Sequence, residues 1–453
     1  MSLTGPPPPA TNPLRQMLGD LRAERSAAVP FPSGEMGFSV RRTRAIVRDP
    51  LRVLLAAYAR HGPVFTMRVL HNPVVFMLGP EANRFMTLGH PELFEYRGGY
   101  YGDLLPLLGD GLLTIDGDFH RRSRRIMLPA FHRQRIAAAG AVMRHQADRA
   151  VSRWADGGSV DLYRWTRELT LLVAARALFG LQDERDAARQ FRAALDFWAV
   201  DFHLRVLRGP RTPWARMIAA RDRLDALVYG EIARRRRTGE RGEDLLSLLL
   251  DASDEDGSRL SDRQVRDEVM TLLFAGHDTT TASVCFLFYE LARAPVVAEH
   301  VALELERGQS SELLERALDE ALRLWPPAWI GPRRSVATFE LHGVRVPGGV
   351  HVAYSSLASH RLPDVWPQPD AFRPERWEPA ARATLPAGAY IPFGGGSRTC
   401  IGMRFGRLEV LEIASRVLRQ YRLELQPGWS LRAKQTPTLG PAAGMPVRTR
   451  LRR

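Results

Sequence analysis

The stretch that decides the fold reads Phe-Gly-Gly-Gly-Ser-Arg-Thr-Cys-Ile-Gly and runs from Phe393 to Gly402. A lone cysteine binds a metal as a thiolate, which requires a pKa below the free value of about 8.5. Backbone N–H groups directed at the sulfur of Cys400 would lower that pKa, and the preceding glycines let the backbone come close. The positive end of the helix expected to follow would favour the anion further. The stretch therefore predicts a metal with one axial cysteine ligand.

Two further residues of this stretch suit the same role. Phe393 would shield the sulfur from water, and Arg398 offers a cation for an anionic group two residues from Cys400. The alternative interpretation is a glycine-rich turn that contains an incidental buried cysteine. The combined spacing of Phe, Gly, Arg, Cys and Gly favours metal binding, since it is far more specific than a run of glycines.

The composition excludes several classes of protein. The chain has 453 residues, a formal charge of +14, 45% hydrophobic residues and 25% charged residues, which is typical of a globular protein. A disordered chain, a collagen and a small disulfide-stapled module are therefore excluded. The two cysteines, Cys285 and Cys400, cannot build a disulfide framework or a multi-cysteine metal site. Together with the lack of a secretory segment, they indicate the cytoplasm.

The charge and hydropathy patterns also limit the partners. Because a membrane span needs about 18 or more apolar residues and no such uncharged run occurs, we expect no integral membrane anchor. The basic excess is arginine scattered among carboxylates, with local runs such as Arg234 to Arg237. No nucleic-acid reading motif accompanies these runs, so we expect no nucleic acid as partner. An acidic protein partner fits better, because a positive patch steers association.

The pattern along the chain predicts a mainly α fold with a smaller β portion drawn from both ends. Residues 1–30 contain the run Pro6 to Pro9, and we expect an extended arm because consecutive prolines cannot pack as helix or sheet. Residues 31–453 are expected to form one domain. Alternating apolar residues predict a hairpin of Val64–Leu70 and Val74–Leu78, and a three-and-four spacing predicts helices from about residue 80 to residue 324.

A helix predicted from Asp262 to Arg293 carries polar residues at its centre, which reads Phe-Ala-Gly-His-Asp-Thr-Thr-Thr. Gly, Asp and Thr have low helix propensity, and a buried carboxylate is costly unless it is compensated. In the functional interpretation, Ala275 and Gly276 form a groove for a diatomic ligand. Thr279 presents a hydroxyl, and Asp278 connects to solvent through water, so that the pair delivers protons. The alternative is a polar helix–helix contact or a kink.

Both motifs resemble those of the cytochrome P-450 family, the haem-thiolate monooxygenases. The cysteine stretch is similar to the family's haem-binding signature, and the helix centre is similar to its distal motif without a departure. The resemblance implies that Cys400 is the proximal iron ligand and that Arg398 pairs with a haem propionate. It implies that Thr279 hydrogen-bonds the oxygen ligand while Asp278 relays protons. The other cofactor contacts that it implies in these motifs are Phe393, Gly402, Ala275 and Gly276.

The resemblance also implies a buried Glu-Arg-Arg triad. Glu320 and Arg323 share a face of a helix predicted from Ser311 to Leu324, and Arg376 follows in the segment Phe-Arg-Pro-Glu-Arg-Trp. A Glu/Arg pair on a helix is usually solvated, which is the alternative here. The match favours a structural triad that locks the loop of Cys400. In the fold implied, the haem is buried between a long distal helix and this proximal loop.

Further basic residues match the family's propionate contacts. His120 and Arg124 are spaced i and i+4, so they share one helix face; the alternative is a basic surface helix. A second candidate is Arg333 or its neighbour Arg334, and the match favours Arg333.

The function implied is that of a haem-thiolate monooxygenase. It would use haem b and dioxygen to hydroxylate or epoxidise an apolar small molecule. The two electrons would come singly from a ferredoxin or flavodoxin, served by an NAD(P)H-dependent reductase and docked on a monomer near Cys400. The arginines expected at that docking face are Arg121, Arg122, Arg125, Arg404 and Arg407. The alternatives are a peroxide-driven hydroxylase, which usually lacks the acid–alcohol pair, and a non-catalytic haem sensor or carrier.

The expected substrate pocket is apolar and aromatic, which favours a terpenoid, steroid, fatty acyl or polyketide-like compound. For each lining residue the alternative is a place in the ordinary core. The residues predicted to line the pocket are Tyr100, Leu104, Phe274, Trp329, Ile330 and Leu439.

Overall fold

The structure is a computed structural model that describes residues 13–99, 102, 104–180, 184–200, 205, 207–242, 244–253, 257, 259–308, 310–435 and 438–452. The chain divides into two compact units, each drawn from three segments. The first unit comprises Met1–Arg121, Trp329–Pro369 and Leu385–Cys400, and the second comprises Arg122–Ala328, Asp370–Thr384 and Ile401–Arg453. Residues 31–453, predicted as one domain, therefore contribute to both units. The predicted mainly α fold with a smaller β portion is confirmed.

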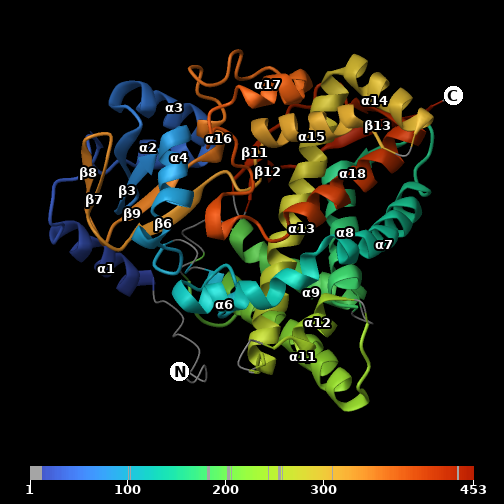
Figure 1. Cartoon of the computed structure of the whole chain (residues 1–453), viewed down its shortest axis with the longest axis horizontal. Helices are drawn as coiled ribbons and strands as arrows, with labels where there is room; N and C mark the ends of the chain where they lie inside the picture. Colours follow the sequence, from blue (N-terminus) through green and yellow to red (C-terminus); the bar gives the residue numbers. More distant parts are fainter. Residues whose placement is uncertain are drawn as a thin grey trace. The chain divides into compact units, whose positions relative to one another are not determined.

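A mixed sheet forms the centre of the first unit (Figure 1). Its strands, in spatial order, are β1 (Gly34–Glu35), β2 (Val64–Val69), β3 (Asn72–Met77), β9 (His351–Tyr354), β6 (Gly331–Ser335) and β4 (Phe94–Glu95). The predicted hairpin is confirmed, since β2 pairs antiparallel with β3, with Val64 opposite Met77. Further elements of this unit include α1 (Pro13–Arg25), α2 (Val40–Arg48), α3 (Pro50–His61), α4 (Pro80–Arg84), α5 (Leu105–Leu108), α16 (Ser356–Ser359) and the hairpin of β7 (Phe339–Leu341) and β8 (Val344–Val346).

The two faces of this sheet bury two separate apolar clusters. Val75 and Val352 belong to one cluster, and their strand neighbours Phe76 and Ala353 belong to the other. This alternation is the period of two that a strand imposes on its side chains. Because both faces are covered, β3 is buried along its whole length.

The N-terminal segment departs from the prediction. The proline run lies outside the described residues, but residues 13–25, predicted within an extended arm, form helix α1. Pro13 occupies the first turn, where its missing N–H costs nothing. The helix is tied to the sheet by buried Asp20, whose carboxylate lies 3.2 Å from His351 Nε2 and 3.3 Å from His71 Nε2. Burial acts to raise the pKa of Asp20, but these hydrogen bonds and the charge of Arg334 outweigh it, and the pKa is lowered. Tertiary contacts therefore decide the conformation here.

Replacement of Asp20 by Asn is expected to destabilise the protein by about 3 kcal/mol at pH 7. The amide removes the negative charge that His351 and Arg334 face in the folded protein. A lowered pKa stabilises the fold above the unfolded value, so the difference should shrink as the pH falls below about 4. Urea unfolding of wild type and Asp20→Asn at several pH values measures it. Asp118→Asn, which removes an exposed carboxylate, is the matched control. Equal unfolding free energies of wild type and Asp20→Asn at pH 7 would contradict the assignment.

The second unit is helical around a long central helix, α13 (Asp262–Arg293). Its other helices are α7 (Arg133–Val151), α8 (Leu162–Val173), α9 (Glu184–Ala199), α11 (Pro213–Thr238), α12 (Leu245–Asp251), α14 (Pro295–Arg307), α15 (Glu312–Leu324), α17 (Pro379–Ala383) and α18 (Met403–Gln420). Its strands are β5 (Ser159–Asp161), β10 (Tyr421–Leu425) and β13 (Pro446–Leu451) in one sheet and β11 (Ala433–Lys434) and β12 (Gly440–Pro441) in a hairpin. The boundary between the units falls within α6 (Gly117–Met127).

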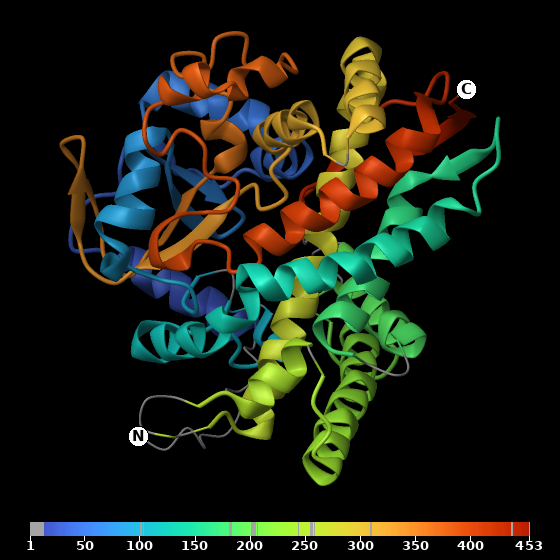
Figure 2. The same cartoon turned by 45° about the vertical axis from the view of Figure 1, so that its right-hand side comes forward.

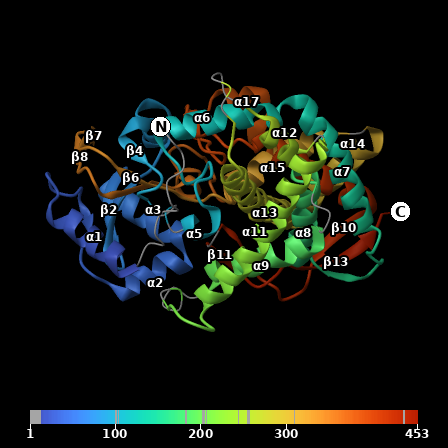
Figure 3. The same ribbon diagram turned by 90° about the horizontal axis from the view of Figure 1, so that it is seen from below.

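Helix α13 has the bounds predicted from the sequence. It begins with a capping box, in which the Ser261 side chain accepts from the backbone of Gln264 and the Gln264 side chain accepts from the backbone of Ser261. Helices α8, α15 and α18 pack against it, and Figures 2 and 3 show it running through the bundle. Among the described residues, no single helix is both long and apolar enough to cross a membrane. Helices α13 and α14 meet that test only as a pair bent by 111°.

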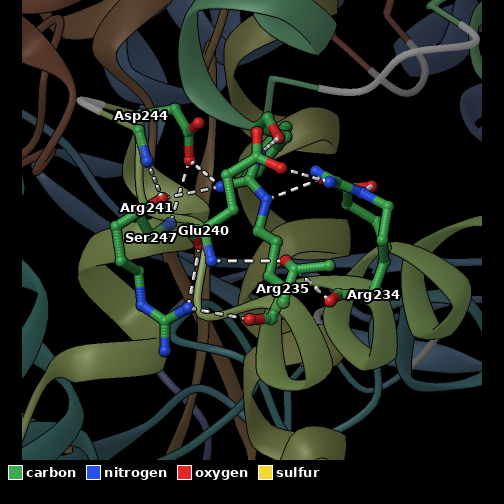
Figure 4. Close-up of polar contacts among 10 residues, drawn as sticks. Arg234, Arg235, Glu240, Arg241, Asp244 and Ser247 are labelled. Carbon is green, nitrogen blue, oxygen red and sulfur yellow. Dashed lines mark hydrogen bonds and ion pairs between the residues drawn. The ribbon is translucent and has the colours of Figure 1, made fainter.

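The basic run from Arg234 to Arg237 is largely neutralised by ion pairs at the corner of α11 and α12 (Figure 4). Arg235 is buried and donates to Asp244 Oδ1 at 2.6 Å and to Ser247 Oγ at 2.7 Å. Arg234 pairs with Glu231 and Glu240, and Arg236 pairs with Asp262. The run therefore stabilises a helix corner and does not present a continuous basic patch.

Candidate functional site

The cysteine loop of the first unit is closed by backbone hydrogen bonds. The N–H of Cys400 donates to the carbonyl of Phe393 at 2.9 Å. Gly396 has a φ of +62°, and a Cβ on it would lie 1.9 Å from the carbonyl oxygen of Thr87. A side chain there is therefore excluded by both conformation and space. Close packing against Thr87 thus accounts for a glycine in this loop, a reason that the sequence alone does not reveal.

The two cysteines differ in the property that decides metal binding. Cys400 is exposed at the end of the loop, whereas Cys285 is buried in α13. Burial raises the pKa of the Cys285 thiol, so that thiol stays protonated. Only a thiolate ligates a metal well, and Cys400 is therefore the accessible ligand of the two. Helix α18 begins at Met403, after Gly402 at its N-cap.

Arginines gather around Tyr96 in the first unit. The guanidinium carbon of Arg333 lies 3.4 Å from the centroid of the Tyr96 ring, and that of Arg398 lies 4.1 Å from it. Arg333 also hydrogen-bonds the Tyr96 hydroxyl, and Arg398 donates to Asp116 Oδ1 at 2.8 Å. Two cations against the Tyr96 ring make a place suited to an acidic ligand group. Tyr96 and Asp116 were not predicted, and no local motif marks them.

Arg333 and Arg334 are neighbours in strand β6 and have different surroundings. Neighbouring residues of a strand point to opposite faces, and Arg334 lies 3.4 Å from Asp20 on the face opposite Tyr96. Of the two, Arg333 therefore shares the environment of Arg398.

In α6, His120 is buried and Arg124 is partly buried one turn later. Their contact with a propionate stays a prediction.

Helix α13 has an opening in its otherwise buried middle. From residue 264 to residue 288, Ala275 is exposed, Gly276 and Thr279 are partly exposed, and every other residue is buried. These three positions are spaced i, i+1 and i+4, so they lie on one face. The Thr279 hydroxyl donates to the carbonyl of Ala275 at 2.6 Å. The structure therefore has a small exposed surface, which bears the Thr279 hydroxyl, at the position where the sequence predicts a groove.

Asp278 lies buried behind this opening and has a partner that the sequence did not reveal. The Thr438 hydroxyl donates to Asp278 Oδ2 at 2.7 Å. His277 Nδ1 lies 3.1 Å from the Thr170 hydroxyl, which lies 2.9 Å from that of Thr281. Burial lowers the pKa of His277 to about 3, so the ring is uncharged at neutral pH. The role of Asp278 in proton delivery stays a prediction.

The predicted triad assembles in the second unit around Glu320. Arg323 donates from Nε and Nη2 at 2.9 and 2.8 Å, and Arg376 donates from Nε at 3.2 Å. The backbone N–H of Arg373 and the indole of Trp377 each donate at 3.0 Å. Both carboxylate oxygens therefore have donors, which holds the segment from 371 to 377 on α15. The sequence did not predict the Trp377 contact.

The residues predicted to line a substrate pocket fall in both units. In the first unit, Leu104 is buried, and Trp329 and Ile330 pack partly buried against an apolar cluster. In the second unit, Phe274 and Leu439 are buried, and the N–H of Leu439 donates to Pro327 O at 2.9 Å. Tyr100 lies outside the described residues. The pocket itself stays a prediction.

Comparison with known proteins identifies the family. The family model described as Cytochrome P450 matches residues 43–446. The cyclooctat-9-en-7-ol 5-monooxygenase of Streptomyces melanosporofaciens is 33% identical over 408 residues, which cover 86% of this chain and 88% of that protein. The pentalenene oxygenase of Streptomyces avermitilis is 30% identical over 406 residues, covering 85% and 90%. The structure of retinoic acid bound cyanobacterial CYP120A1 has a TM-score of 0.83 and 28% identity, covering 94% of this chain and 100% of that one. The chain therefore belongs to the cytochrome P450 family.

Membership settles the class of reaction. The protein is a cytochrome P450 monooxygenase of the bacterial type that uses haem b and dioxygen, and its family acts on apolar substrates with electrons from redox partners. The residues of the first unit fit that cofactor. Cys400 offers an accessible thiol for the iron, and Arg333 and Arg398 concentrate positive charge suited to propionates.

Proposed function

We propose that Cys400 is the axial ligand of the haem iron, that Arg333 and Arg398 bind its propionates, and that Asp278 and Thr279 deliver protons during oxygen insertion. The observation that carries the proposal is the opening in α13. Packing of a buried helix does not by itself explain why Ala275, Gly276 and Thr279 are left exposed on one face. Haem b, when bound, supplies the activation of dioxygen with two electrons.

The residues of α13 have separate tasks in this scheme. Thr279 holds a hydroxyl at the opening, where it can orient a water molecule. Asp278 stores and passes a proton from the buried side, where Thr438 fixes its carboxylate. General acid catalysis requires such an acid within reach of the reacting group or one water away. An intact acid–alcohol pair supports dioxygen-dependent turnover.

Removal of the Thr279 hydroxyl is expected to uncouple the reaction. In Thr279→Ala, product formed per NADPH should fall about tenfold or more, because proton delivery loses the hydroxyl that orients a water molecule. The peroxide released should rise in compensation. Product, peroxide and NADPH are measured in one assay with a ferredoxin system.

Two variants control this experiment. Thr279→Ser keeps the hydroxyl and should stay coupled. Thr280→Ala removes the adjacent, buried threonine and should leave coupling near that of the wild type. Unchanged coupling in Thr279→Ala would overturn the role of this hydroxyl.

The substrate proposed is a polycyclic terpenoid. The named substrates of the two relatives above support this choice, as do the apolar side chains predicted to line the pocket. A panel of terpenoids, steroids and fatty acids tests it through the low-to-high-spin shift of the bound haem. A shift with fatty acids alone would contradict the proposal.

The electron donor proposed is an acidic ferredoxin or flavodoxin with its NAD(P)H-dependent reductase, acting on a monomer in the cytoplasm. The net charge of +14 supports an acidic donor, and a sequence with two cysteines supports a reducing compartment. Of the arginines predicted to face the donor, Arg404 is exposed. Arg407 pairs with Asp319 and Arg121 pairs with Asp118, so both already have acidic partners within the chain.

A further inference from the structure

Asp116 directly precedes α6, and its carboxylate binds the segment that follows β4. The N–H of Tyr96 lies 3.0 Å from Asp116 Oδ1 and 3.1 Å from Oδ2, and the N–H of Arg97 donates to Oδ2 at 2.9 Å. An aspartate before a helix commonly accepts from the first N–H groups of that helix, whereas both oxygens of Asp116 accept from residues about 20 positions earlier in the chain. The carboxylate therefore fixes the backbone at Tyr96 and Arg97.

The same carboxylate binds Arg398 of the cysteine loop. Arg398 donates from Nη2 to Asp116 Oδ1 at 2.8 Å, and the two side chains are 15% and 27% exposed. The guanidinium carbon of Arg398 also lies 4.1 Å from the centroid of the Tyr96 ring. A guanidinium is a planar fork of N–H donors, so an ion pair at one nitrogen and a ring against its plane set the direction of the other donors. Asp116 thus acts on Arg398 both directly and through Tyr96.

A second cation beside Tyr96 gives the negative charge of Asp116 a further task. Strands β4 and β6 pair antiparallel with Glu95 opposite Arg334, so the register brings Tyr96 next to Arg333. The guanidinium carbon of Arg333 lies 3.4 Å from the centroid of the same ring. Two like charges so close repel each other, and a carboxylate that pairs with one of them offsets this repulsion. Asp116 therefore favours a conformation in which both arginines stay near Tyr96.

We propose that Asp116 is a positioning residue that holds Arg398 ready to bind a haem propionate, and this inference rests on the proposed role of Arg398. A side chain that is fixed before its ligand arrives binds it more tightly, because less freedom is lost on binding. The carboxylate is itself held by two backbone N–H groups, so it offers Arg398 a fixed partner. Those backbone contacts need only acceptor atoms at position 116, whereas the ion pair with Arg398 needs the charge.

The rate of haem loss tests this role on the haem-loaded protein. Haem transfer to an excess of apomyoglobin measures that rate, and it should rise about tenfold in Asp116→Asn because Arg398 loses its charged partner. The propionate bending band in the resonance Raman spectrum should shift to lower frequency, since the hydrogen bond to the propionate weakens. Asp110→Asn is the matched control, because Asp110 has a similar exposure of 25% and pairs with Arg97. It should leave both the rate and the band unchanged.

A combination of variants distinguishes action through Arg398 from a general effect on the loop. Asp116→Asn added to Arg398→Gln should not speed haem loss beyond Arg398→Gln alone, whereas independent structural effects would multiply. Circular dichroism monitors the folding of each variant. Multiplied effects, or a rate and a Raman band in Asp116→Asn equal to those of the wild type, would overturn the positioning role. A wild-type rate and band in Arg398→Gln would instead refute the proposed propionate contact of Arg398, so the two failures are distinguishable.

Discussion

Replacement of Cys400 by alanine is expected to abolish monooxygenation. Thiolate ligation donates electron density to the haem iron and favours O–O cleavage, and no other cysteine can take over because Cys285 is buried in α13. Product formation should fall by about three orders of magnitude, the equivalent of about 4 kcal/mol in the activation barrier. The reduced carbonyl complex should also lose the absorbance band typical of thiolate coordination. Turnover and this spectrum together measure the effect.

Cys285→Ala is the matched control, because it removes the other thiol of the chain. It should cost about 1 kcal/mol of stability from lost packing, and it should keep the thiolate band and the activity. Cys400→Ser, nearly isosteric with the wild type, separates ligation from folding of the loop. A thiolate band that survives in Cys400→Ala or disappears in Cys285→Ala would contradict the assignment.

Features whose signals lie close together in the sequence were predictable. The apolar flanks and the polar centre predicted a helix from about Asp262 to Arg293, and α13 has these bounds. The alternation of apolar residues in β2 and β3 predicted their hairpin, because this signal also lies within a short stretch of sequence. Helix α1 was not predictable, since its anchor is the contact of Asp20 with a histidine 331 positions away. Local propensity cannot register such a contact.

The site shows the same division. Residue types and spacing predicted Cys400 and the acid–alcohol pair as site residues, because their chemistry depends on short motifs. The partners of the site residues come from distant parts of the chain, such as Asp116 beside Arg398 and Thr438 beside Asp278, which are separated by 282 and 160 positions. The resemblance favoured Arg333 over its neighbour Arg334, both of which lie in β6. Only the sheet register shows which of them meets Tyr96.

Replacement of Glu320 by glutamine is expected to be the most destabilising isosteric change in the second unit. Its carboxylate is fully buried and accepts five hydrogen bonds, from Arg323, Arg376, Trp377 and the backbone of Arg373. The amide removes the negative charge, leaves Arg323 without its buried counter-charge, and turns an N–H₂ group toward donors. Breaking such a buried pair costs about 3–5 kcal/mol.

The geometry also predicts how strongly three variants should destabilise the protein relative to one another, and this order tests the explanation. Arg376→Ala should cost less, about 2 kcal/mol, because it removes the longest hydrogen bond to Glu320, 3.2 Å from a largely buried side chain, and leaves the pair with Arg323 in place. Glu378→Gln, which breaks an exposed pair with Arg316, should cost less than about 0.5 kcal/mol. Urea unfolding followed by circular dichroism measures all three variants. If Glu320→Gln cost no more than Glu378→Gln, the triad would not hold this segment on α15, and the apolar packing around α15 would have to account for its stability.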